Sequence, residues 1–369
     1  MSPTLLGPCS RYAPRRSSSA QLTLSSLASV MLAGLLLSSC RGADSGVGRA
    51  TAGPLRPFAD YFEPVDSMML KCDPEHDVVR LSGIAIGSEG QVVVTDPSQG
   101  NVLMFDGSDC RVLGSRGEGP GEFIVPIGPR FDELGRLHVL DPALGRISVF
   151  SAGGAFLENI NTSREVPAAF GFELMAPSKY VLAGSRTTDS SIVFVLDSAG
   201  TLQSAFLPIG KARPAGTDDT PFWGTMRFPS VAVHSDSIFA AQGLIPSLFI
   251  VDAATGDAAV ECIPVPGYKP PEASTSPLSP QEFRDWRSKQ MLAMGTYTAL
   301  GHVFVPFVNG VYFDGDPSIL MERLSARHWV ALVDAPPILA GSDSALWALD
   351  VPSLLDNDPG ILVRSYRAR

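Results

Sequence analysis

Four acidic residues are the first candidates for chemistry. Asp96 and Asp141 each follow a short, mostly apolar run and precede a proline, and Glu118 and Glu122 lie within Arg116-Gly117-Glu118-Gly119-Pro120-Gly121-Glu122-Phe123. Carboxylate oxygens are the ligands of Ca²⁺, so a calcium site is one interpretation. The interpretation we favour is that each aspartate accepts backbone N–H bonds in its own turn, while the glycines supply the angles of a tight crossover. We therefore predict no cofactor, with calcium as the alternative.

A second candidate is the aromatic segment Pro221-Phe222-Trp223-Gly224-Thr225-Met226-Arg227-Phe228. Phe222 and Trp223 could stack on a ligand, and Arg227 could donate two hydrogen bonds to it. The structural alternative is that the two aromatic rings fill a gap between elements. We predict a ligand-binding face made of Phe222, Trp223 and Arg227 together with Arg116, Glu118 and Glu122.

No catalytic set can be identified. The five histidines, His76, His138, His234, His302 and His328, do not lie within metal-ligand spacing of one another, and no Gly-x-Ser-x-Gly elbow is present. Cys-x-x-Cys pairs are absent too, so we predict no metal site. Whether the protein is an enzyme stays open, and the sequence favours a non-enzymatic role.

The first 39 residues read as an export signal. Arg11, Arg15 and Arg16 precede a mostly apolar, uncharged stretch, Leu22 to Leu37, which is shorter than the roughly 20 residues of a membrane-spanning helix. Leu37-Ser38-Ser39-Cys40 resembles the lipobox of bacterial lipoproteins, in which the chain is cut before a cysteine that then carries a diacylglycerol. The resemblance implies a lipidated Cys40 and a place in the bacterial envelope. Arg41 instead of Asp at the next position favours the outer membrane where a cell has two.

Residues 40–57 are mostly small or polar and predict a flexible tether between the lipid and a folded domain over 58–369. Removal of residues 1–39 lowers the formal charge from −10 to −13. Such an acidic chain without a basic cluster is a poor partner for nucleic acid, so membrane contact should come from the acyl chains.

Three cysteines remain in the folded domain. Cys72, Cys110 and Cys262 are an odd number for an oxidising compartment. A bridge between Cys72 and Cys110 and a set of three thiols are both compatible with the sequence.

The elements that must position these residues follow from an internal repeat. Gly90 to Pro97 returns as Gly135 to Pro142, and Gly100 to Phe105 returns as Gly145 to Phe150, each offset by 45 residues. Short β-branched runs separated by Gly, Asp and Pro predict four strands per unit, at Gly83 to Ile86, Gln91 to Thr95, Val102 to Phe105 and Cys110 to Gly114. Four strands joined by short turns form an antiparallel blade.

The later blades are predicted from fainter runs. The third has Phe170 to Met175, Tyr180 to Ala183, Ile192 to Leu196 and Leu202 to Leu207, and the fourth Ser230 to Val233, Ser237 to Ala241, Leu248 to Val251 and Val260 to Val265. For the fifth blade, between Tyr297 and Val333, the sequence does not indicate where the individual strands begin and end. The last blade, with Ile338 to Leu339, Leu346 to Leu349 and Ile361 to Tyr366, ends one strand short. We expect Val65 to Lys71 to supply that strand and close the ring.

The segment from Lys269 to Met294 is an insertion, which leaves six blades. Ser279-Pro280-Gln281-Glu282 fits a capping box, so a helix near 279–294 should start there. The predicted fold is all-β: a six-bladed β-propeller of four-stranded antiparallel blades, closed by an N-terminal strand and carrying one helical insertion.

The repeated Asp-Pro and Gly-Arg-Ile-Ser-Val-Phe motifs and the Arg116 to Phe123 crossover resemble six-bladed propeller lipoproteins of NHL/TolB-like type. The resemblance implies an architecture rather than a chemistry. We therefore predict a lipid-anchored extracytoplasmic protein that binds a small ligand, a glycan or an envelope protein through its loop-rich face. The alternative is a calcium-dependent hydrolase or lyase of lactonase-like type.

Overall fold

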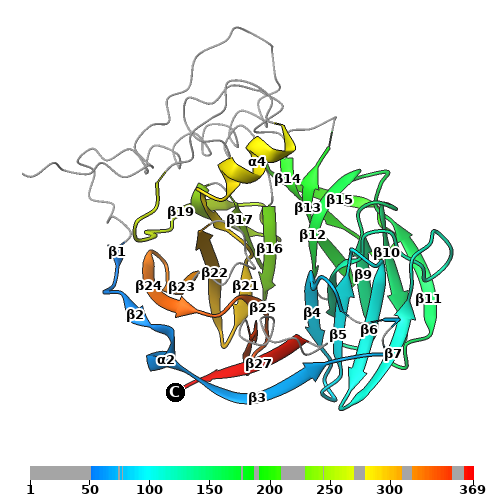
Figure 1. Ribbon diagram of the computed structural model, residues 1–369. Helices are drawn as coiled ribbons and strands as arrows, with labels where there is room; N and C mark the ends of the chain where they lie inside the picture. The colour runs from blue at the N-terminus through cyan, green and yellow to red at the C-terminus, as the bar shows by residue number, and fades with distance from the viewer. Residues whose placement is uncertain are drawn as a thin grey trace, which may run out of the picture.

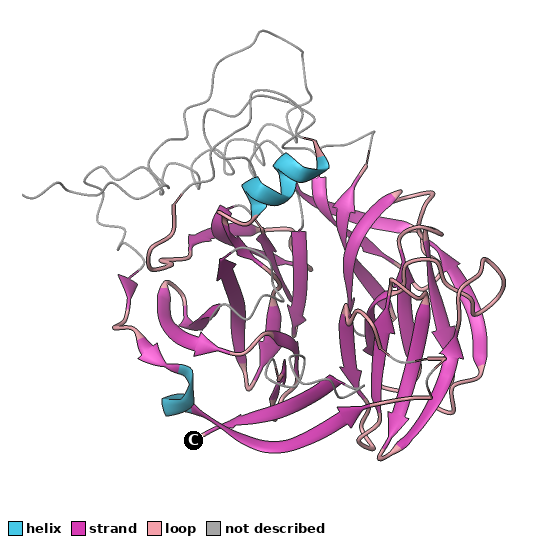
Figure 2. Ribbon diagram, viewed as in Figure 1, coloured by secondary structure: helices cyan, strands magenta, loops and turns pink. Residues whose placement is uncertain are grey.

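The chain forms a ring of six antiparallel sheets around a central axis (Figure 1). The computed structural model describes residues 51–73, 75–76, 78–175, 178–186, 191–208, 229–243, 245–269, 279–309, 318–350 and 361–369. Strands dominate these residues, and Figure 2 shows only two short helices, α2 (Phe58–Tyr61) and α4 (Pro280–Arg287). The predicted all-β six-bladed propeller is confirmed.

The sequence repeat corresponds to blades 1 and 2. Blade 1 consists of β4 (Gly83–Ile86), β5 (Val92–Asp96), β6 (Asn101–Asp106) and β7 (Asp109–Gly114), and blade 2 of β8 (Ile127–Phe131), β9 (Leu137–Asp141), β10 (Arg146–Phe150) and β11 (Phe156–Asn161). The glycines Gly100 and Gly145 open equivalent third strands with φ of 72° and 61°. That left-handed conformation favours glycine and explains why it recurs there.

Blades 3 and 4 follow the predicted division closely. Blade 3 consists of β12 (Ala168–Met175), β13 (Lys179–Ser185), β14 (Ser191–Leu196) and β15 (Leu202–Pro208), and blade 4 of β16 (Pro229–His234), β17 (Ser237–Gln242), β18 (Ile245–Asp252) and β19 (Ala258–Cys262). The last strand of blade 4 ends at Cys262, not at Val265. Ile263 and Val265 are buried after the strand, in the cluster between blades 4 and 5, and this explains why the apolar run overshoots.

Blade 5 has the strand division that the sequence left unresolved. Its strands are β21 (Tyr297–Ala299), β22 (His302–Asn309), β23 (Ser318–Ser325) and β24 (His328–Ala335), and β20 (Met291–Ala293) also pairs with β22. Helix α4, which precedes β20, starts where predicted but ends at Arg287 and not near the expected residue 294. Leu292 and Ala293 are buried against blade 5, so this apolar stretch continues as a strand.

The ring closes as expected. Blade 6 consists of β25 (Ile338–Gly341), β26 (Leu346–Leu349), β27 (Ile361–Ala368) and β3 (Phe62–Leu70). The N-terminal strand β3 pairs antiparallel with the C-terminal strand β27 from Phe62↔Ala368 to Leu70↔Ile361. Figure 1 shows the two strands side by side at the edge of the ring. This pairing covers the edge that β27 would otherwise expose.

The segment before β3 contributes more than a tether. Strands β1 (Thr51–Ala52) and β2 (Arg56–Pro57) pair in parallel with β24, the outer strand of blade 5. Backbone pairing needs no apolar side chains, so composition gave no signal for these strands. Phe58 then stacks on Phe62 with ring centroids 4.8 Å apart. The N-terminal chain thus joins the outer edges of blades 5 and 6.

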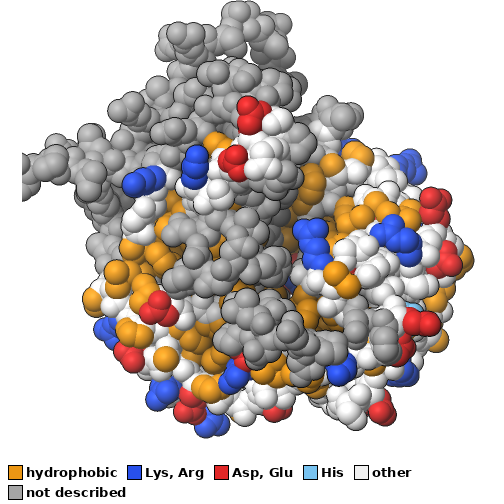
Figure 3. All heavy atoms as spheres, viewed as in Figure 1, with side chains coloured by type: hydrophobic (Ala, Val, Ile, Leu, Met, Phe, Trp, Pro, Cys, Tyr) orange, Lys and Arg blue, Asp and Glu red, His pale blue; other side chains and the backbone are white. Residues whose placement is uncertain are grey.

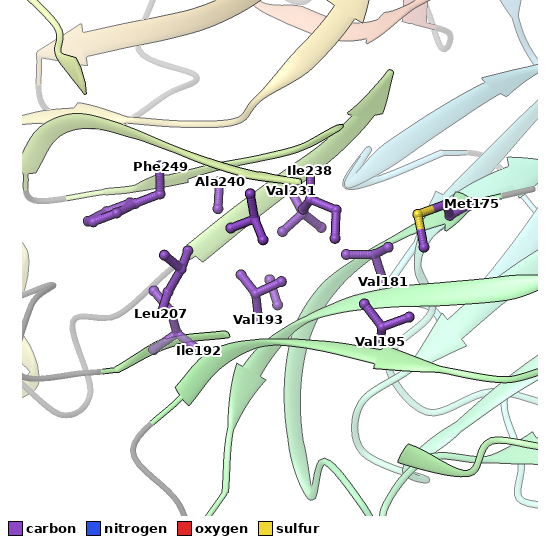
Figure 4. Packing of buried hydrophobic residues seen from close by; sticks show 12 residues of the cluster. Met175, Val181, Ile192, Val193, Val195, Leu207, Val231, Ile238, Ala240 and Phe249 are labelled. Carbon is purple, nitrogen blue, oxygen red and sulfur yellow. The ribbon is translucent and has the colours of Figure 1, made fainter. Parts of the chain in front are cut away.

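The core lies between the blades. Among the described residues, buried apolar side chains form six clusters, each between two consecutive blades. Figure 4 shows the contact between blades 3 and 4, where Val181 and Val193 of one sheet face Val231 and Ile238 of the next. Middle strands such as β5, β9 and β18 are buried on both faces because each blade has a neighbour on either side.

The predicted capping box is present at α4. The Ser279 N–H donates to Glu282 Oε2 over 2.8 Å, and the Glu282 N–H donates to Ser279 Oγ over 3.3 Å. The bond from Ser279 lowers the pKa of the Glu282 carboxyl. Within the described residues, no helix is long and apolar enough to cross a membrane.

Candidate functional site

The crossover from Arg116 to Phe123 joins blades 1 and 2, and the antiparallel strand order puts it on the face where β5 and β9 end. Its two ends pair: the Phe123 N–H donates to the Ser115 carbonyl over 2.9 Å, and the Gly117 N–H donates to the Phe123 carbonyl over 3.0 Å. The buried Phe123 ring packs in the cluster between blades 1 and 2. The crossover is therefore fixed at its base, with its tip toward solvent.

A single arginine holds the tip. Arg146 Nη1 donates to the Glu118 carbonyl (3.0 Å), and Nη2 donates to the carbonyls of Gly119 (2.7 Å) and Glu122 (2.8 Å). Arg146 opens β10 directly after Gly145, at the position that Asn101 occupies in blade 1. The guanidinium carries its donors in a planar fork, which suits several carbonyls held at fixed positions.

We expect Arg146→Ala to lower the free energy of unfolding by about 2–3 kcal/mol, because it removes three charge-assisted hydrogen bonds at once. Urea denaturation measures the change. Arg116→Ala is the matched control: its exposed guanidinium makes one bond, from Nη2 to the Ser98 carbonyl over 2.9 Å, and its loss should cost less than about 1 kcal/mol. Equal effects of the two substitutions would contradict the clamp.

The three predicted site residues of the crossover have different environments. Glu122 is half-buried, and its Oε2 accepts the Gly119 N–H over 2.8 Å. A Cβ at Gly117 would lie 2.0 Å from the same oxygen, so the glycine leaves room for this carboxylate. Arg116 and Glu118 are exposed. The structure thus gives Glu122 a place inside the loop and leaves the other two on its surface.

The remaining predicted positions lie outside the described residues. These are the ligand-binding candidates Phe222, Trp223 and Arg227 and the lipidation candidate Cys40. The described residues on either side of 209–228 belong to β15, the last strand of blade 3, and β16, the first strand of blade 4. Their role stays a prediction.

Asp96 and Asp141 are turn formers, as favoured from sequence. Asp141 Oδ1 accepts the N–H groups of Ala143 (2.9 Å) and Leu144 (3.1 Å) in its own turn. Its Oδ2 accepts those of Ile124 (2.7 Å) and Val125 (3.2 Å) in the incoming link.

Asp96 repeats this arrangement in blade 1. Its Oδ1 accepts from Ser98 and Gln99 and its Oδ2 from Val79 and Arg80. Both aspartates are buried, and each fastens a link to its blade. Their oxygens are occupied by backbone donors, and no three His, Cys, Asp or Glu side chains of the described chain converge as metal ligands.

His138 is part of a buried polar chain between blades 2 and 3. Its Nε2 lies 3.2 Å from Asp132 Oδ2, and its Nδ1 lies 3.1 Å from the Tyr180 hydroxyl. Burial lowers the pKa of His138, and the bond with Asp132 opposes that shift. The His138 side chain is only 4% exposed, so these bonded groups are structural and not open to a substrate.

The lowered pKa of His138 predicts that acid destabilises the protein. The unfolded chain takes up this proton near pH 6.5 and the folded chain only at lower pH, so stability is complete above about 6.5 and falls below it. The loss is at most about 1.4 kcal/mol per pH unit. Urea denaturation at pH 7.5 and 5.5 should show a larger loss in wild type than in His138→Gln. The same loss in both would assign the acid sensitivity to other groups.

A cavity of about 230 Å³ lies on the axis of the ring. It is lined by the innermost strands of all six blades, through Ile84, Arg130, Glu173, Val233, Tyr297 and Gly341 among others. Arg130, Glu173, Val233 and Gly341 lie near the ends of their strands, where the chain turns back into the second strand of each blade. The cavity therefore lies toward the face opposite the crossover.

Sequence reasoning missed Arg130, Glu173 and Tyr297. The available signal was a polar residue within a predicted innermost strand, and Glu173 within Phe170 to Met175 met it. For Arg130 and Tyr297 the strands themselves were not assigned. Figure 3 shows that, on the face in view, acidic and basic side chains of the described residues are interspersed without a large area of one sign.

Comparisons with known proteins extend the fold assignment. No family model matches the chain, and no curated protein matches it in sequence. A putative exported protein from Bacteroides fragilis is similar in structure, with a TM-score of 0.61 and 11% identity over 86% of this chain and 98% of its own. A member of the DUF4221 family from Bacteroides vulgatus has a TM-score of 0.55 and 9% identity over 84% of this chain and 99% of its own.

A catalytically inactive virginiamycin B lyase from Staphylococcus aureus aligns more loosely, with a TM-score of 0.47 and 11% identity over 77% of this chain and 80% of its own. At such low identities the likeness concerns the fold alone. The chain is a six-bladed β-propeller whose structural neighbours include a putative exported protein.

Proposed function

We propose that the protein is a lipid-anchored, extracytoplasmic propeller that binds an envelope protein non-enzymatically through its loop-rich face. One observation carries this proposal: the crossover is clamped at three carbonyls by Arg146, while the side chains of Arg116 and Glu118 remain exposed on it. A pre-organised loop loses little conformational entropy on binding. An exposed acid next to an exposed base suits the polar rim of a protein partner.

Attachment at Cys40 would orient this face in the envelope. The lipobox-like sequence supports the anchor, and the exported neighbour agrees with an extracytoplasmic location. Replacement of Cys40 by Ala should move the protein from the membrane fraction to the soluble fraction. An unchanged distribution would argue against lipidation.

Binding is tested by affinity capture from detergent extracts of the envelope. Wild type is compared with the double variant Arg116→Ala/Glu118→Ala and with a matched pair on the opposite face, Glu133→Ala/Lys179→Ala, whose side chains are also exposed. We expect the first pair to lose the partner and the second to retain it. Equal recovery by all three proteins would contradict a site on the crossover, whereas a glycan or a small molecule at the same residues would revise only the partner class.

The alternative, a calcium-dependent hydrolase or lyase, has a direct test. Elemental analysis that finds about one calcium or zinc ion per chain would support it. The hydrogen bonds of Asp96 and Asp141 argue against these two carboxylates as the ligands.

A further inference from the structure

The axial cavity holds one ion pair with a fixed geometry. Arg130 Nε donates to Glu173 Oε2 over 2.7 Å, and Arg130 Nη1 donates to the Pro129 carbonyl over 2.8 Å. Glu173 Oε1 accepts the Leu174 N–H over 3.0 Å. The pair joins the innermost strands of blades 2 and 3 and is held by backbone groups at both ends.

Hydrogen-bonding capacity remains on both charges. Among the described residues, Arg130 Nη2 has no partner, and each oxygen of Glu173 accepts one bond where it can accept two. The Arg130 and Glu173 side chains are 25% and 21% exposed, so a small molecule in the cavity can reach them. The cavity thus offers an unused cationic donor beside unused anionic acceptors.

Tyr297 adds a second donor. Its hydroxyl makes no hydrogen bond within the described chain, although the residue lines the same cavity. Burial raises its pKa to about 12, so the hydroxyl is protonated at neutral pH. A Cβ at position 295 would lie 2.6 to 2.7 Å from the Tyr297 ring and hydroxyl, so the glycine there allows this close approach.

The remaining lining combines apolar side chains with the hydroxyl residues Thr296, Thr298 and Ser342. Ile84, Ile86, Leu174 and Val233 lie around the polar groups. The hydroxyls of Thr296 and Thr298 are bonded to Ser230 and to the Val233 carbonyl. Arg130, Glu173 and Tyr297 are thus the polar side chains of the lining that keep unused hydrogen-bonding capacity, and apolar side chains lie beside them.

We propose that this cavity binds a small zwitterion of the α-amino acid class. Its carboxylate accepts hydrogen bonds from Arg130 Nη2 and the Tyr297 hydroxyl, its ammonium donates to Glu173, and its side chain contacts the apolar lining. The charges of the pair cancel, so a net anion meets Glu173 and a net cation meets Arg130 without compensation. A molecule with both charges satisfies both groups, and about 230 Å³ accommodates a small or medium-sized amino acid.

The test uses residues 40–369, the chain without its predicted export signal. Each of the twenty standard amino acids is titrated into it by calorimetry. We expect at least one to bind with a Kd below about 1 mM. Its amine and its carboxylic acid analogues, which each lack one charge, should bind at least roughly tenfold more weakly, as expected for a lost bond between charged groups.

Single substitutions test whether the amino acid binds in this cavity. Tyr297→Phe removes only a hydroxyl without a partner in the described chain, so the fold should persist, and affinity should fall roughly tenfold or more. Glu173→Gln should bind the amino acid and its carboxylic acid analogue, which lacks the ammonium group, with similar affinity. Tyr366→Phe and Glu158→Gln, whose side chains lie outside the cavity, are the matched controls and should bind like wild type.

The proposal is overturned if none of the twenty amino acids binds, or if Tyr297→Phe and Glu173→Gln bind the same probe as tightly as wild type. Partner capture through the crossover does not depend on this site, which lies toward the opposite face. Either proposal can fail while the other stands.

Discussion

Removal of the disulfide should lower the free energy of unfolding by about 4 kcal/mol. Cys72 and Cys110 are bonded across 38 residues of sequence, and a loop of that length loses roughly this much entropy in the unfolded chain when it is cross-linked. Cys72 follows β3 of blade 6, and Cys110 lies in β7 of blade 1. The bond therefore joins the segment that follows blade 6 to the outer strand of blade 1, whereas the ring itself is closed within blade 6 by the pairing of β3 with β27.

The measurement is urea denaturation of Cys72→Ser/Cys110→Ser under non-reducing conditions. Cys262→Ser, which leaves the bond intact, is the control and should change stability by less than about 1 kcal/mol. A double variant as stable as wild type would contradict a stabilising role for the disulfide.

The second large effect is expected from Asp141→Asn. The carboxylate accepts two N–H groups on each oxygen, and an amide can accept on only one side. Two backbone donors in a part-buried site then lose their acceptor, which should cost about 3 kcal/mol. Thermal or urea denaturation measures the loss, and Asp96→Asn should behave alike because its bonds repeat the pattern.

Asp252→Asn is the matched control for this substitution. Asp252 Oδ1 accepts the N–H groups of Ala254 and Thr255 in a turn of the same form, but the residue is exposed and fastens no link. Its amide can keep both bonds, so the change should be below about 1 kcal/mol. Equal losses of stability in Asp141→Asn and Asp252→Asn would mean that the bonds within the turn account for the effect and that the bonds of Asp141 to Ile124 and Val125 do not.

The fold could be predicted from the sequence because the repeat marks its strands and turns with residues that are close together in the chain. Strands of blade 1 and their counterparts in blade 2 share a short, mostly apolar run, a turn aspartate or an opening glycine, so the division into strands can be predicted without long-range information. The closure by β3 followed from a count, because blade 6 lacked one strand. The ends of β19 and α4 were misjudged because buried apolar residues continue past them, and periodicity cannot mark where a strand or helix stops.

The contacts between distant residues could not be predicted. The bond of Cys72 with Cys110 was left open because spacing does not determine pairing. Arg130 and Glu173 are 43 residues apart and meet only because both lie on innermost strands. The carbonyls that Arg146 holds are backbone groups, which no residue pattern reveals. The two short strands before Phe58 are likewise formed by backbone pairing alone.

The exposed side chains of the crossover could be nominated from sequence, but their exposure could not. Glu118 and Glu122 looked equivalent in the motif, and the structure separates them. Glu122 is bonded inside the loop, and Glu118 is exposed. For partner binding, Glu118 with Arg116 is accordingly the part of the predicted face that the described chain offers to solvent.

Site-specific photocrosslinking in cells that make the protein tests partner binding at the crossover most directly. A photoreactive amino acid is placed at position 118 and, for comparison, at position 133, which is equally solvent-facing on the opposite side of the ring. We predict a discrete crosslinked protein from position 118 and none from position 133. Crosslinks of the same pattern from both positions, or none from position 118, would contradict the proposed binding face.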